Sequence, residues 1–102
     1  MSFIDTLRED RRGVILCALD EMGGNRLAEG SVKSVLASLG HVVGGDVVRT
    51  DLEWLQQQGL LRVERVPAGD GGEHWLAQLL EAGQDVARGV RHPGVKRQAP
   101  KR

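Results

Sequence analysis

The chain is 102 residues long and 40% hydrophobic, which allows one small domain with a single core and little more. Its formal net charge is zero, and its one cysteine excludes an internal disulfide and a multi-cysteine zinc site and suits a reducing compartment. The sequence contains no apolar stretch of about 18 residues and does not begin with a basic segment followed by an apolar one. We therefore expect no transmembrane helix, no signal peptide and no membrane partner.

The charges are unevenly distributed along the chain. Residues 88–102 hold six of the fourteen Lys and Arg side chains and no Asp or Glu, so residues 1–87 carry eight basic against fourteen acidic side chains, a net charge of −6. A basic tail on an acidic body has two readings. It is either a solvated, disordered segment or an arm whose Lys and Arg side chains hold phosphates and release counterions.

Residues 3–22 are predicted to form the first helix. Gly13 weakens the middle of this helix and could mark a bend or a break, and residues 23–25 end it. Phe3 and Leu16 fall away from the predicted core face, and exposed apolar residues of this kind can line a dimer contact. The apolar residues that share the core face at 100° per residue are Ile4, Leu7, Ile15, Ala18, Leu19 and Met22.

Two further helices are predicted on either side of a short connector at residues 41–44. The second spans residues 29–39 and closes at Gly40. The third spans residues 45–58, and Gly59 is placed to end it in the left-handed conformation. Its buried face is formed by Val48, Leu52 and Leu55, and the polar side chains on its far side are Asp46, Arg49, Thr50, Glu53, Gln56 and Gln57.

After residue 59 the hydrophobic period changes from 3.6 to about 2, which predicts strands at residues 60–66 and 73–79. Residues 67–72 between them are rich in Gly, Pro and Asp and form the predicted turn of a β-hairpin. Residues 80–89 are predicted to form a last short helix. The basic remainder, residues 90–102, is predicted to be a disordered tail because it cannot bury a core.

The order helix, helix, helix, hairpin, helix predicts a winged helix-turn-helix domain at residues 1–89, in the mostly α, α+β class. Three helices form its core, and a two-stranded wing and a short C-terminal helix complete it. The third helix buries one face on the first two helices. Its other face is then free to enter a DNA major groove, which is about 12 Å wide.

The stretch from Val48 to Leu61 resembles the recognition helix and strand start of winged-helix regulators of the MarR and ArsR kind. The residues that match the general pattern of that helix are Leu52, Leu55, Gly59 and Leu60. Residues 79–83 with Val86 resemble the segment that leads from the wing into the last helix. The chain departs from the pattern at Leu80, where a threonine often stands, and its single cysteine is at odds with metal sensing of the ArsR type.

Over nearly its full length the chain also resembles a group of small winged-helix proteins encoded by Mu-like phages and prophages. This resemblance implies a phage or prophage protein in the cytoplasm of a bacterial host cell. The segments that carry the resemblance are residues 7–12 with 14–16, Leu39-Gly40-His41, Arg49-Thr50-Asp51-Leu52 with Trp54-Leu55, and residues 93–97.

The candidate DNA-binding residues come from three parts of the chain. On the third helix, Arg49 could bind guanine, Gln56 and Gln57 could bind adenine, and Thr50 could contact a phosphate or a thymine methyl group. Asp46, Asp51 and Glu53 lie on or beside the same face and would repel phosphates, unless one of them, such as Glu53, accepts from cytosine. The basic side chains expected to contact the DNA backbone are those of Arg62 and Arg65 in the wing and Lys96 and Arg97 in the tail.

The sequence contains no catalytic triad order, no phosphate-binding loop and no nucleotide fingerprint, and its three histidines are not spaced as metal ligands. We expect no enzyme activity, no cofactor and no metal. The favoured function is a phage or prophage transcriptional regulator that reads duplex DNA with residues 45–58, as a homodimer on a two-fold site. The alternative is a protein-interaction module in phage assembly or packaging, in which the same scaffold binds a phage protein and the helix face is merely solvated.

Overall fold

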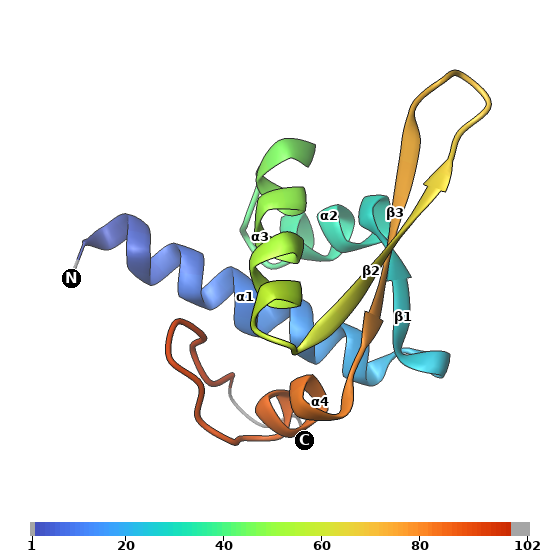
Figure 1. The fold of residues 1–102 in the computed structure, drawn as a ribbon. Coiled ribbons are helices and arrows are strands. Elements are labelled where there is room, and N and C mark those ends of the chain that lie inside the picture. The colour runs from blue at the N-terminus through green and yellow to red at the C-terminus, as the bar shows by residue number, and fades with distance from the viewer. Residues whose placement is uncertain (1, 99–102) are drawn as a thin grey trace.

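A computed structural model describes residues 2–98 (Figure 1). Over that range the chain has an α+β fold of four α-helices and a three-stranded antiparallel sheet. The elements in chain order are α1 (Phe3–Glu21), a 3-10 turn η1 (Gly23–Asn25), β1 (Arg26–Ala28), α2 (Glu29–Ser38), α3 (Gly45–Gln57), β2 (Leu61–Pro67), β3 (Glu73–Leu79) and α4 (Glu81–Ala87).

Helix α1 is continuous through Gly13, so the glycine marks no break. The helix begins after Ser2, whose hydroxyl oxygen accepts a hydrogen bond from the Asp5 N–H at 3.1 Å. It ends at Glu21, and the chain turns through Gly24 and Asn25, both at positive φ. The predicted end of this helix at residue 22 is confirmed to within one residue.

The core lies around the C-terminal half of α1, against which α2, α3, α4 and β3 all pack. Leu16 is fully buried, although the sequence placed it away from the core face. That prediction was wrong because it assumed one buried face, whereas several elements cover α1 on more than one side. Ile4 and Leu7 were assigned to the core and are exposed, because the first two turns of α1 extend beyond the body of the molecule (Figure 1).

Helices α2 and α3 are joined by a short turn, as predicted. Gly40 has φ +93°, and the His41 N–H donates to the Leu36 carbonyl at 2.8 Å, which closes the end of α2. Helix α3 ends in the same way. Gly59 has φ +74°, and the Leu60 N–H reaches back to the Leu55 carbonyl at 3.1 Å, so the predicted left-handed stop is confirmed.

The sheet has strand order β1-β3-β2, so the predicted two-stranded wing is part of a three-stranded sheet. Strand β1 pairs with β3 from Arg26↔Gln78 to Ala28↔Leu76. Three residues are too few to give a readable alternation, which is why β1 was not predicted. The predicted hairpin is confirmed, since β2 and β3 pair from Leu61↔Leu79 to Pro67↔Glu73. The end of the hairpin that carries the turn extends beyond β1 (Figure 1).

Residues 90–98, hereafter the C-terminal strap, lie against α1, in contrast to the disordered tail predicted from residue 90. The Lys96 N–H donates to the Glu9 carbonyl at 3.1 Å, and Arg12 Nη1 donates to the Gly94 carbonyl at 3.0 Å. A Cβ on Gly13 would lie 2.2 Å from the Lys96 carbonyl oxygen, so the glycine in α1 makes room for the strap. The rest of the predicted tail, residues 99–102, lies outside the described residues.

Candidate nucleic-acid interface

Helix α3 has two chemically different faces. Its inner face buries Val48, Leu52 and Leu55 in the core. Its outer face consists of the exposed residues Asp46, Thr50, Glu53 and Gln57. The Thr50 hydroxyl donates to the Asp46 carbonyl one turn back, at 2.9 Å, which leaves its methyl group and an oxygen lone pair for other contacts. This outer face carries no basic side chain.

Asp51 belongs to the inner face and is only 2% exposed. Arg11 of α1 binds it through two hydrogen bonds, Nε to Oδ2 at 2.7 Å and Nη2 to Oδ1 at 3.3 Å. Asp51 was predicted to lie beside the exposed polar face, and that placement was wrong. The spacing held the signal, since residue 51 lies three positions after Val48 and four before Leu55, within the apolar stripe.

Arg49 is held between α2 and the hairpin. Its Nε and Nη2 donate to the two carboxylate oxygens of Glu29 at 2.7 and 2.9 Å, and Nη2 also donates to the Glu73 carbonyl at 2.9 Å. Glu29 in turn accepts the Trp75 N–H at 2.7 Å. The guanidinium group also lies over the Trp75 ring, 4.8 Å from its centroid. Arg49 thus fixes α3 against the start of β3, near the turn of the hairpin, and two of its three nitrogens are engaged there.

Glu29 and Arg49 each stabilise the charged form of the other. The hydrogen bonds from Arg49, joined by the one from the Trp75 N–H, hold the pKa of Glu29 below its ordinary value despite its partial burial. The Glu29 carboxylate raises the pKa of Arg49 in turn. Both groups are therefore charged at neutral pH, and the pair stays neutral overall. Glu29 and Trp75 were not predicted to take part, because their contact with α3 depends on long-range pairing.

Gln56 was predicted to bind adenine, but its side-chain carbonyl oxygen binds a backbone N–H of the protein. Oε1 accepts the Val63 N–H at 2.7 Å. Strand β2 lies at the edge of the sheet, so this N–H has no strand partner on its outer side. Gln56 caps part of that edge, whereas the neighbouring Gln57 remains exposed on the outer face.

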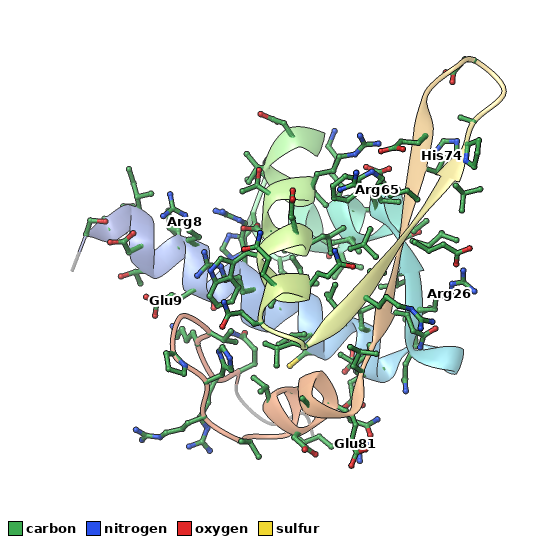
Figure 2. All side chains as sticks on the ribbon, viewed as in Figure 1. Arg8, Glu9, Arg26, Arg65, His74 and Glu81 are labelled. Atoms are coloured by element: carbon green, nitrogen blue, oxygen red, sulfur yellow. The ribbon has the colours of Figure 1, made fainter. Side chains whose placement is uncertain are left out.

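The two predicted basic residues of the wing lie on opposite faces of the hairpin. Arg65 stands across from Trp75 and places its guanidinium carbon 4.5 Å from the centroid of the ring, on the side of the sheet that faces the helices. Figure 2 shows Arg65 between the hairpin and α3. Arg62 is three residues earlier and points to the other side, because side chains alternate along a strand. Only Arg65 shares a side with α3.

The C-terminal strap carries the exposed cations Lys96 and Arg97. Its backbone is held at Lys96 and Gly94, as described above, and Gln98 Nε2 donates to Asp10 Oδ1 at 3.1 Å. Burial raises the pKa of Asp10, but the hydrogen bonds from Gln98 and His41 outweigh it and keep that pKa below its ordinary value.

The strap also contacts the C-terminal half of α3 through Trp54. A Cβ on Gly94, which has φ +84°, would lie 2.9 Å from the Trp54 ring, and Arg12 stacks on the same ring at 3.8 Å from its centroid. The strap therefore lies next to α3 at Gly94, whereas its Arg97 side chain lies beside Gly89 at the end of α4.

Residues 2–98 hold no group of three or more His, Cys, Asp or Glu that could bind a metal ion. Among the same residues, no helix combines the length and the apolar character needed to cross a membrane. His41, one of the scattered histidines, has its Nε2 2.7 Å from Asp10 Oδ2 and is part of the contact between α1 and the connector.

Comparison with known proteins gives relatives at about 40% identity. The chain is 40% identical over 98 residues to gp26 of Escherichia phage Mu, a protein described as uncharacterized, and the match covers 95% of this chain and 96% of gp26. It is 41% identical over 69 residues to an uncharacterized protein of Haemophilus influenzae, covering 68% of this chain and 67% of that protein. No family model matches the sequence. The identity and coverage show that this chain belongs to the family of phage Mu gp26.

Proposed function

We propose that this protein is a winged helix-turn-helix domain that binds duplex DNA through the outer face of α3 and acts as a phage or prophage transcriptional regulator. One observation carries the proposal. Helix α3 follows α2 through a short turn and keeps its outer face free, while the β2–β3 hairpin runs back beside α3 toward that helix's N-terminal end (Figure 1). This is the arrangement in which a helix enters the major groove and a wing meets the adjacent backbone.

The reading residues in this proposal are Thr50, Glu53 and Gln57. Gln57 pairs with adenine through its amide, Glu53 accepts from the cytosine N4 amino group, and the Thr50 methyl group packs on a thymine methyl. Arg49 and Gln56 act indirectly, because one fixes the angle between α3 and the wing and the other completes the edge of β2. From the sequence alone, Arg49 and Gln56 were expected to contact bases directly.

The phosphate contacts come from cations on the hairpin and the strap and not from α3 itself. Arg65 lies on the α3 side of the hairpin, and Lys96 and Arg97 are exposed on the strap. Because Asp46 and Glu53 repel phosphates, these flanking cations supply the attraction. Few phosphate contacts imply a shallow dependence of affinity on salt.

The proposal is tested by selecting bound sequences from random duplex DNA and then titrating the selected duplex across a salt series. Replacing Thr50 and Gln57 by Ala should abolish the preference for the selected sequence and leave the affinity for random DNA nearly unchanged. Replacing Lys96 and Arg97 by Gln should weaken binding to both, and should reduce the slope of log K against log salt by about 2, since each phosphate contact contributes about 0.9. Absence of any binding at about 50 mM salt would refute the proposal, because electrostatic binding is strong there.

The acidic outer face of α3 favours one other function. A surface with Asp46 and Glu53 and no Lys or Arg suits a basic protein surface, as expected for a protein-interaction module in phage assembly or packaging. In that case a phage-encoded partner would bind the chain without DNA, and replacing Glu53 by Lys would weaken that complex.

A further inference from the structure

The four exposed side chains on the outer face of α3 form a single row along the helix. They belong to Asp46, Thr50, Glu53 and Gln57, which are spaced by four, three and four positions. At 100° per residue, these positions fall within about 60° of one another around the helix axis. The row is roughly 16 Å long, because each residue advances an α-helix by about 1.5 Å.

The first three side chains of this row offer hydrogen-bond acceptors and no donor. The carboxylates of Asp46 and Glu53 accept only when they are ionised, and the Thr50 hydroxyl already donates its proton to the Asp46 backbone carbonyl at 2.9 Å. In the described part of the chain, neither carboxylate has a hydrogen-bond or ion-pair partner. The one arginine of α3, Arg49, is bound to Glu29 and supplies no donor to this row.

A row of acceptors fits the amino groups of the DNA major groove. Cytosine presents only its N4 amino donor there, whereas guanine presents the two acceptors N7 and O6 and thymine presents the acceptor O4. Adenine has an N6 amino donor, but its N7 acceptor lies beside that group and would face the second oxygen of a carboxylate. Cytosine is therefore the one base that meets a carboxylate with a donor and no neighbouring acceptor.

We propose that Asp46 is a second specificity-determining residue, and that Asp46 and Glu53 together select two cytosines in the bound duplex. The inference rests on the proposed binding of DNA by α3 and names the class of sequence that α3 selects. Asp46 lies in the first turn of α3, and recognition helices contact base edges with their N-terminal residues.

The spacing of the two carboxylates sets the spacing of the two cytosines. Asp46 and Glu53 are seven positions apart, which is about 10 Å along the helix axis. Base pairs of B-DNA are stacked about 3.4 Å apart, so this distance corresponds to about three base pairs. The target class is a duplex with two G·C pairs about three base pairs apart, each contacted on its cytosine.

Isosteric amide variants test each carboxylate separately. Asp46→Asn and Glu53→Gln replace the carboxylate by an amide, which pairs with adenine. In a selection from random duplex DNA, Asp46→Asn should change the preferred base from cytosine to adenine at one position, and Glu53→Gln should do so at the other. The matched control is Glu81→Gln, which changes an exposed acid in the first turn of α4 and should select the wild-type sequence. Equal unfolding midpoints show that the variants are folded.

Removal of a single amino group tests the contact itself. Pyrimidin-2-one in place of one cytosine of the selected duplex lacks the N4 amino group and keeps the rest of the ring. The affinity of the wild type should fall about fivefold or more at each of the two positions. Glu53→Ala should lose no further affinity at the position that Glu53 contacts, and should still lose affinity at the position that Asp46 contacts.

The outcomes separate this inference from the proposed function. A selected sequence that depends on Thr50 and Gln57, but is the same for wild type, Asp46→Asn and Glu53→Gln, supports reading of DNA by α3 and overturns the two-cytosine target. A pyrimidin-2-one duplex that binds as tightly as the cytosine duplex overturns it as well. A wild type that selects no sequence overturns both the inference and the proposed function.

Discussion

The inner and outer faces of α3 both carry polar side chains, and these have different tasks. On the inner side Asp51 is buried against Arg11, and beside it Arg49 and Gln56 are bound to Glu29 and to the edge of β2. On the outer side Glu53 and Gln57 are exposed. Polarity on a surface helix therefore does not by itself identify a residue that is free to contact a ligand. Asp51 and Gln56 bind other parts of the domain, although Glu53 and Gln57 on the outer face carry the same chemical groups.

The largest expected effect comes from breaking the buried pair on the inner face. Asp51→Ala leaves the half-buried guanidinium of Arg11 without its carboxylate, and removing one partner of a buried ion pair costs about 3–5 kcal/mol. Urea denaturation at neutral pH measures the loss. The matched control is Asp46→Ala on the outer face, which should cost less than about 1 kcal/mol through the helix dipole. Equal losses of stability for Asp51→Ala and Asp46→Ala would mean that the buried acid contributes no more to stability than the exposed one.

Glu29→Gln tests the cluster that joins α3 to the hairpin. It replaces a carboxylate that accepts from both Arg49 and the Trp75 N–H, and we expect a loss of about 1–3 kcal/mol of stability at pH 7. The pKa of Glu29 is lowered in the folded state, so its contribution is complete above its unfolded pKa of about 4.3 and disappears as the pH falls through the lower folded value.

The stability difference between wild type and Glu29→Gln should therefore narrow below about pH 4. Denaturation curves recorded from pH 7 down to pH 3 measure it. A stability difference that stays constant from pH 7 to pH 3 would contradict an ion pair between Glu29 and Arg49.

Gly13→Ala tests the C-terminal strap, which packs against α1 and against Trp54 of α3. Helix propensity alone predicts a gain of about 1 kcal/mol. The Cβ would clash with the Lys96 carbonyl, and such overpacking costs about 1–3 kcal/mol, so we expect net destabilisation. The Lys96 amide should also exchange faster with solvent, because its bond to Glu9 is lost.

The control for this substitution is Gly30→Ala in α2, where a Cβ would have open space. It should stabilise the protein by up to about 1 kcal/mol. If Gly13→Ala behaves in the same way, the strap does not lie against α1 as described.

The smallest effect distinguishes two neighbouring glutamines. Gln56→Ala leaves the Val63 N–H without its acceptor and should cost about 1 kcal/mol, whereas Gln57→Ala should stay within about 0.5 kcal/mol. Thermal unfolding of both variants is sufficient to rank them. A larger loss for Gln57→Ala would reverse the assignment of the two side chains.

Local patterns in the sequence predicted most of the helices and strands. The end of α3 at Gly59, the bounds of β3 and the turn at Gly40 follow from residues close in sequence, and these predictions are confirmed. Strand β1 was missed because its three residues are defined by their pairing with β3 and not by a local alternation.

The roles of the polar residues were harder to predict, because each depends on a distant partner. Arg49 looked free because Glu29 lies twenty positions earlier, and Asp51 looked exposed because Arg11 lies forty positions away. The strap was predicted to be disordered from its composition, yet Gly13 and Trp54 provide the surface on which it packs. Only Asp51 carried a local signal, in its position within the apolar stripe.

The most direct test of the account is whether the outer face of α3 lies against DNA. Glu53→Lys replaces an acid on that face with a base, and Glu81→Lys makes the same charge change on the exposed first turn of α4 (Figure 2). The account predicts that Glu53→Lys weakens the preference for the selected sequence but tightens binding to random duplex DNA and steepens the slope of log K against log salt there by about 0.9, while Glu81→Lys leaves all three close to the wild-type values. Equal effects of the two substitutions, or none from Glu53→Lys, would contradict the account.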